Sequence, residues 1–151
     1  MSYNFGAGNK ERVKKAFFTQ FKVCTIFTSC FWLIMLLFPK LFAGIFSNNT
    51  DLITYTAWAL RIYMAGIFSL GFQVACQQSF MALGQAKVSL LLACLRKLIL
   101  LIPLIFILPL FIQDKVFAVF LAEPISDIVA AAITTITFMS RFNGILNRGK
   151  V

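Results

Sequence analysis

Histidine is absent from the 151 residues, and acidic side chains number only five. Without histidine the chain cannot form a Ser-His-Asp triad, a Cys-His dyad or the usual His-containing zinc sites. Five acidic residues also leave little material for catalysis by paired carboxylates. Charged residues of both signs make up 13 % of the chain, whereas a soluble domain averages about 25 %. These shortages argue against an enzyme.

Cysteines are few, and none lies in a CxxC spacing. The four are Cys24, Cys30, Cys76 and Cys94, each within an apolar stretch. We interpret them as small hydrophobic side chains rather than as a disulfide framework or a metal site.

Apolar residues are abundant instead, at 60 % of the chain, and phenylalanine alone supplies 18 positions. A soluble domain averages about 45–50 %. A chain of this length has too little interior to hide so much apolar surface from water. The formal net charge of +9 is concentrated at the ends of apolar runs, which favours orientation in a lipid bilayer over binding of nucleic acid. The composition therefore predicts an all-α membrane protein.

Long stretches with few charges predict four transmembrane helices, since about 20 residues cross a hydrocarbon core of roughly 30 Å. The expected spans are about 17–46, 52–83, 87–112 and 116–140. Residues 1–16 are expected to be the end of a further helix and a basic cytoplasmic loop. Residues 17–142 then form the transmembrane region, and residues 143–151 a cytoplasmic tail.

Basic residues predict the orientation of these spans. Lys40 and Lys115 fall on one side of the membrane. Eleven basic residues are assigned to the other side: Lys10, Arg12, Lys14, Lys15, Lys22, Lys87, Arg96, Lys97, Arg141, Arg148 and Lys150. Because cytoplasmic loops carry the excess of Lys and Arg, we expect a multi-pass protein of the plasma (inner) membrane with both termini in the cytoplasm.

The second span carries small and polar residues at helical spacing. A small-residue stripe, which lets another helix approach closely, consists of Gly71, Ala75 and Ser79. Gln73 and Gln77 share another face, where they either form hydrogen bonds between helices or line a polar substrate cavity. Arg61 lies near the outer end of this span. It either extends to the membrane surface or has a functional role.

The fourth span contains two carboxylates. Glu123 and Asp127 lie on one helical stripe together with Ala130, Thr134 and Thr137. From Lys115, Glu123 is roughly 12 Å and Asp127 about 18 Å into the membrane. A carboxylate at that depth costs on the order of 3 kcal/mol, so it must face protein or water. One interpretation is a carboxyl group satisfied by a neighbouring helix; the other is a role in binding a cation, a proton or substrate.

Four stretches of the chain strongly resemble the MATE (multidrug and toxic compound extrusion) transporters, in the same order and over residues 2 to about 142. The first is the opening Ser2-Tyr3-Asn4-Phe5-Gly6-Ala7-Gly8-Asn9 with Arg12-Val13-Lys14-Lys15-Ala16. The second is Arg61-Ile62-Tyr63 with Phe72-Gln73 and residues 80–87, and the third is Arg96 with Ile102-Pro103 and Leu108-Pro109. The fourth is Pro124-Ile125-Ser126-Asp127. The resemblance implies helices nine to twelve of twelve, part of the second six-helix lobe.

The resemblance also implies a function. MATE transporters export cationic and amphipathic compounds in exchange for protons or sodium ions, by alternating access between two lobes. It implies no cofactor beyond that coupling ion. The partners expected are the lipid bilayer, small cationic or amphipathic drugs, and the N-terminal lobe, which this sequence lacks.

No established coupling residue of the family can be placed on this chain, because the expected tenth helix lacks Asp and Glu and the first helix is absent. The candidate cavity or coupling residues are therefore Asp127, Glu123, Gln73, Gln77 and Arg61. Met1 takes the place of an apolar residue of the eighth helix, which suggests a C-terminal fragment that is inactive alone. Two alternatives are a fragment of a lipid or oligosaccharide-lipid flippase, and a stand-alone oligomeric four-helix membrane protein without transport activity.

Overall fold

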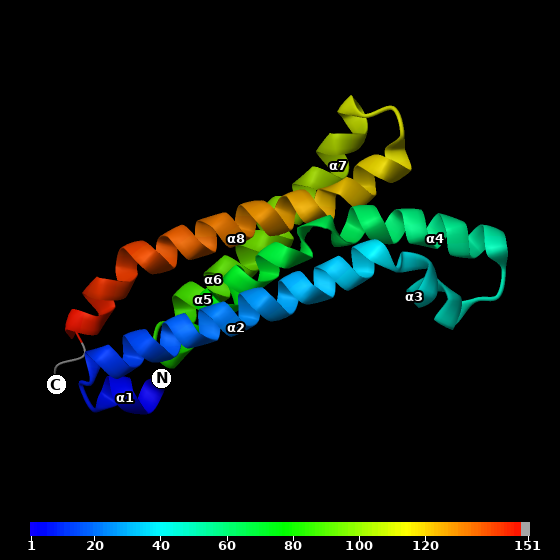
Figure 1. Cartoon of the computed structure of the whole chain (residues 1–151). Coiled ribbons are helices and arrows are strands. Elements are labelled where there is room, and N and C mark those ends of the chain that lie inside the picture. The colour runs from blue at the N-terminus through cyan, green and yellow to red at the C-terminus, as the bar shows by residue number, and fades with distance from the viewer. Residues whose placement is uncertain (149–151) are drawn as a thin grey trace.

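The computed structural model describes residues 1–148, all of whose regular elements are helices. In chain order they are α1 (Ser2–Gly6), α2 (Lys10–Leu37), α3 (Pro39–Phe46), α4 (Thr50–Tyr63), the 3₁₀ turn η1 (Met64–Gly66), α5 (Ile67–Ala82), α6 (Ala86–Cys94), the π-helical segment η2 (Leu95–Leu101), α7 (Ile102–Phe111) and α8 (Lys115–Arg148). Figure 1 shows them as long rods packed side by side, with the start of α2 and the end of α8 at the same end.

Four of these rods are long and apolar enough to cross a membrane. They are Lys10–Leu37, Thr50–Ala82, Ala86–Phe111 and Lys115–Asn147. The prediction of an all-α membrane protein with four spans is confirmed. The second and third rods each combine two α-helices through an irregular turn, η1 or η2.

Three predicted boundaries differ from the structure. The first predicted span, 17–46, is divided, because α2 ends at Leu37 and Pro39, which has no backbone N–H, begins the separate helix α3. Helix α2 begins at Lys10, within the segment predicted as a loop, because the Asn9 side chain accepts a hydrogen bond from the Arg12 backbone N–H at 3.3 Å. Helix α8 continues to Arg148, so the first part of the predicted tail is helical. The remainder of that tail, residues 149–151 with Lys150, lies outside the described residues.

An aromatic core explains why α8 continues past its apolar span. Phe17 of α2, Phe80 of α5 and Phe138 of α8 are fully buried. The ring centroids of Phe17 and Phe138 are 4.6 Å apart, and those of Phe80 and Phe138 are 4.9 Å apart. Phe142 and Leu146, one and two turns further along α8, join the same cluster. This burial holds the last turns of α8 in a core that α2, α5 and α6 also form.

The small-residue stripe of the second span brings α2 and α5 into close contact. A Cβ atom added to Gly71 would lie 2.9 Å from the Cys24 carbonyl oxygen and 3.0 Å from the Cα of Thr25. Ala75 and Ser79, the other members of the stripe, are completely buried. The predicted close approach of another helix is confirmed, and that helix is α2.

Candidate functional site

Irregular turns of two helices meet α8 at the level of Glu123 and Asp127. Pro124 lies inside α8 between the two acids, and η1 packs directly against it. A Cβ atom on Gly66 would lie 2.7 Å from the Pro124 Cα and 3.1 Å from the Asp127 Cβ. Only glycine fits there without displacing α8, so η1 fixes the position of the acidic stretch from one side.

The segment η2 holds the same stretch from the other side. A regular α-helix would bring the ring of Pro103 against the carbonyl of Ile99, four residues earlier. The wider π turns of η2, just before Pro103, accommodate the ring. The Ser126 hydroxyl donates a hydrogen bond to the Arg96 carbonyl oxygen at 2.8 Å, which joins α8 to η2.

Two ion pairs connect η2 with α8. A guanidinium nitrogen of Arg96 lies 3.1 Å from Oδ1 of Asp127, and Lys97 Nζ contacts Oε1 of Glu123. The two pairs differ in exposure. The Arg96 and Asp127 side chains are 23 % and 4 % exposed, whereas those of Lys97 and Glu123 are 46 % and 11 % exposed. The Arg96–Asp127 pair is therefore the better shielded of the two.

These ion pairs correct the assignment of Arg96 and Lys97 to the second cytoplasmic connection. Both residues lie inside the third span, about 15 Å along the helix from Ala86. The charge count assigned both residues to the cytoplasmic side although the predicted span 87–112 contains them, and the structure pairs their charges with acids of the next span. Nine basic residues remain on the side assigned to the cytoplasm against two on the other.

The buried stripe of α8 is as predicted. Asp127 and Glu123 are buried, as are Ala130 and Thr134, and Thr137 is half-buried. The structure thus supplies the neighbouring helix that satisfies the carboxylates. One carboxylate oxygen is only partly compensated. Oδ1 of Asp127 lies within ion-pair distance of Arg96, but it accepts no hydrogen bond of good geometry within residues 1–148.

A cavity of about 300 Å³ lies beside the ion pairs. Its walls come from α5, α6 and η2, and its lining residues are Leu70, Gln73, Val74, Gln77, Ala93, Arg96 and Lys97. Gln73 is 97 % buried, and its Oε1 has no hydrogen-bond partner in the described part of the chain. The same holds for the buried Nε2 of Gln77. The structure therefore brings both glutamines to this cavity, and within residues 1–148 neither side chain forms a hydrogen bond to another helix.

Arg61 lies outside this cluster. Its side chain is exposed, and its Nε donates to the carbonyl oxygen of Leu36 at 3.4 Å. That carbonyl belongs to the last turn of α2, where a cation is favoured by the helix dipole. The contact assigns Arg61 to the junction of α2 and α4.

Sequence reasoning missed Arg96, Lys97 and Ser126 as members of the site. A usable signal was present: two adjacent cations interrupt an otherwise apolar stretch of span length, and the next span carries two acids. Within residues 1–148, no three His, Cys, Asp or Glu side chains come together as metal ligands. A cation bound here would contact carboxylates that Arg96 and Lys97 already hold.

Comparisons with known proteins agree on one family. The MatE family profile matches residues 1–107. The structure of the MATE multidrug transporter DinF-BH, solved in complex with R6G, shares 29 % identity with this chain at a TM-score of 0.83, over 95 % of this chain and 32 % of that one. An inward-facing multidrug resistance MATE family transporter of the MOP superfamily shares 18 % identity at a TM-score of 0.88, over 99 % of this chain and 34 % of that one.

The chain thus spans about a third of the length of the solved structures it matches. No match is found among the curated proteins. The family profile covers most of the described residues, and the match to DinF-BH extends over nearly the whole four-helix arrangement. The chain belongs to the MATE family, whose members are membrane transporters and not enzymes.

Proposed function

We propose that the chain forms helices nine to twelve of an antiporter that exports cationic or amphipathic compounds in exchange for protons or sodium ions. The observation that carries this proposal is the pair of acid–base contacts between η2 and α8, beside a cavity that Gln73 and Gln77 also line. Membership of the MATE family supports the transport function in general.

The charge balance suggests how coupling works. Arg96, Lys97, Glu123 and Asp127 sum to zero, which lowers the cost of placing them within the membrane. A proton or sodium ion that binds Asp127 competes with Arg96 for the same carboxylate. When the ion neutralises Asp127, the guanidinium loses its partner and turns toward the cavity that it already lines. Ion binding and cavity electrostatics are coupled through this one contact.

The remaining parts of the proposal concern the surroundings of the chain. A second lobe supplies the opposite wall of the transport pathway, so the 151 residues alone do not transport. The chain lies in the plasma membrane with both termini in the cytoplasm, which the remaining excess of basic residues at that end supports.

The first experiment is to sequence the genomic DNA immediately upstream of Met1. An open reading frame that encodes eight further helices would support the antiporter. A start site with its own ribosome-binding sequence would favour the stand-alone membrane protein.

The second experiment measures dye efflux in the full-length antiporter that the upstream open reading frame encodes. Asp127→Asn keeps the shape of the side chain and removes its charge, and Glu123→Gln is the matched change in the more exposed pair. We expect a larger loss of efflux per molecule for Asp127→Asn, with membrane abundance measured in parallel. Normal efflux per molecule by Asp127→Asn would assign this residue to helix packing and contradict the coupling role.

A further inference from the structure

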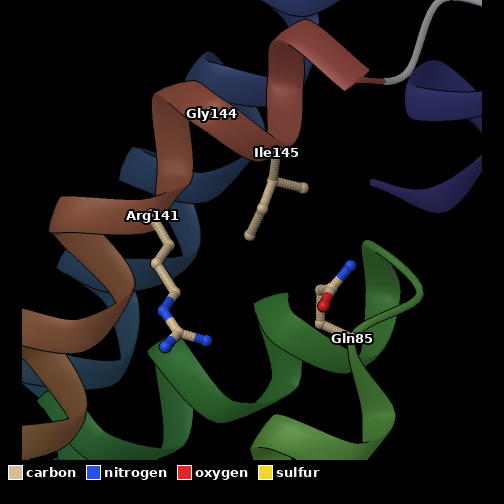
Figure 2. Close-up of a pocket in the computed structure, with 4 residues that line it drawn as sticks. All are labelled: Gln85, Arg141, Gly144 and Ile145. Carbon is tan, nitrogen blue, oxygen red and sulfur yellow. The ribbon is translucent and has the colours of Figure 1, made fainter.

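A second cavity lies at the end of the molecule where α2 begins and α8 ends. Its volume is about 290 Å³, and it is lined by Gln85, Arg141, Gly144 and Ile145. Gln85 lies in the turn between α5 and α6, and the other three belong to the last turns of α8. Figure 2 shows the side chains of Arg141, Gln85 and Ile145 around the space between α8 and this turn.

Within residues 1–148, the polar side chains of this cavity offer N–H donors that no ion pair or helix cap occupies. Arg141 is exposed and forms no ion pair with any acidic side chain of residues 1–148. Gln85 is the residue preceding α6, but its side chain makes no capping hydrogen bond to that helix. A guanidinium group and a side-chain amide together offer several N–H donors, which match the oxygens of a phosphate group.

The rest of the lining is apolar or open. Ile145 is nearly buried and forms an apolar wall. Gly144 adds no side chain, and a Cβ atom built there would meet nothing within 4 Å. A cavity of this volume exceeds what a free phosphate ion fills, so its apolar side has room for the glycerol and first methylene groups of a lipid.

The depth of the cavity is that of lipid headgroups. Arg141 follows Lys115 by 26 residues of continuous helix, which is about 39 Å along α8. A bilayer measures about 40–45 Å including its headgroup regions. Lys87 lies in the first turn of α6, beside Gln85, and adds positive charge at this level. Basic side chains near the membrane surface attract anionic lipids.

We propose that Arg141 and Gln85 bind the phosphate group of an anionic phospholipid in this cavity. The phosphate oxygens accept hydrogen bonds from the guanidinium and the amide, and the glycerol backbone lies against Ile145. The bound lipid connects the α5–α6 turn with the end of α8. This site is separate from the ion pairs, so it stands whether or not the chain transports.

The test uses the purified 151-residue chain in detergent, with bound lipid counted by native mass spectrometry. The probes are phosphatidylglycerol, diacylglycerol of the same acyl chains, and inorganic phosphate as a competitor. We expect one retained phosphatidylglycerol per chain, little retention of diacylglycerol, and no displacement by millimolar phosphate. Equal retention of diacylglycerol would overturn the proposal, and so would displacement by phosphate, which would indicate a site for the free ion.

Variants then locate the site. Arg141→Gln should weaken phosphatidylglycerol binding about tenfold or more, because a hydrogen bond to a charged group is lost. Gln85→Leu should weaken it to a smaller extent. Lys14→Gln removes the same charge from an exposed position that does not line the cavity, and it should bind as the wild type does. Circular dichroism checks that each variant is folded. An equal effect of Lys14→Gln and Arg141→Gln would show general attraction by net charge and refute a specific site.

Discussion

The contact between Arg96 and Asp127 should contribute more to stability than any other polar contact of α8. Asp127→Asn leaves a guanidinium group without its partner inside the third span, and Arg96→Gln leaves a carboxylate that is 4 % exposed. Removal of one member of a buried ion pair costs about 3–5 kcal/mol. Arg96 is partly exposed, so we expect the lower end of that range, about 3 kcal/mol, for Asp127→Asn.

The double variant should be much less destabilised than the sum of the two single variants, because it leaves no unpaired charge. We expect a coupling energy of about 3 kcal/mol, or roughly a hundredfold in the unfolding equilibrium. The assay is unfolding of the purified chain in mixed micelles with increasing dodecyl sulfate, followed by far-UV circular dichroism.

The second ion pair provides the control cycle. Lys97 is 46 % exposed and lines the cavity beside the ion pairs, so its charge can turn into that cavity when Glu123→Gln removes the partner. We therefore expect a smaller coupling energy for Lys97 and Glu123 than for Arg96 and Asp127. A coupling energy near zero for Arg96 and Asp127 would refute the reasoning. So would a coupling for Lys97 and Glu123 that equals or exceeds it.

Three further predictions follow from the orientation, the length and the packing of the chain. In a background without the native cysteines, single cysteines at Asn49 and Gln113 should react with an impermeant thiol reagent added to intact cells, and one at Gln85 should not; labelling at Gln85 would reverse the proposed orientation. Expression of the chain alone in a pump-deficient host should leave dye accumulation and inhibitory drug concentrations unchanged, whereas energy-dependent export would favour an oligomeric small transporter. Gly66→Ala should destabilise the chain by about 1–3 kcal/mol in the same unfolding assay, since its Cβ would lie 2.7 Å from the Pro124 backbone. Gly44→Ala, where nothing lies within 4 Å, is the control and should not destabilise.

Local properties of the sequence were sufficient for several conclusions. Hydrophobicity along a chain is additive, so the number of spans and the membrane location follow without knowledge of the packing. The spacing of Gly71, Ala75 and Ser79 indicates a close helix contact because every fourth residue lies on one face of a helix. The family resemblance is likewise a property of residues in order, and the MatE profile confirms it.

The contacts between spans could not be obtained in this way. The sequence places Asp127 at mid-membrane, but its partner Arg96 is 31 positions away and is selected by how η2 packs against α8. The charge count placed Arg96 and Lys97 on the cytoplasmic side although the predicted span 87–112 contains them, since a lone cation within the membrane is costly. That cost disappears when an acid of another helix lies opposite, and only the tertiary structure shows the pairing.

The length of α8 also depends both on local sequence and on contacts with other helices. Its apolar run predicts a helix that ends near residue 140, and the charge at Arg141 supports that boundary. The helix continues to Arg148, and its last turns are buried: the ring centroid of Phe142 lies 5.1 Å from that of Phe17, more than 120 positions earlier, and Leu146 belongs to the same core cluster. Sequence by itself determined which segments are apolar enough to enter the membrane, because that depends on each residue in turn. Tertiary structure decided which charges are paired and where the last helix ends, because both depend on side chains brought together from distant parts of the chain.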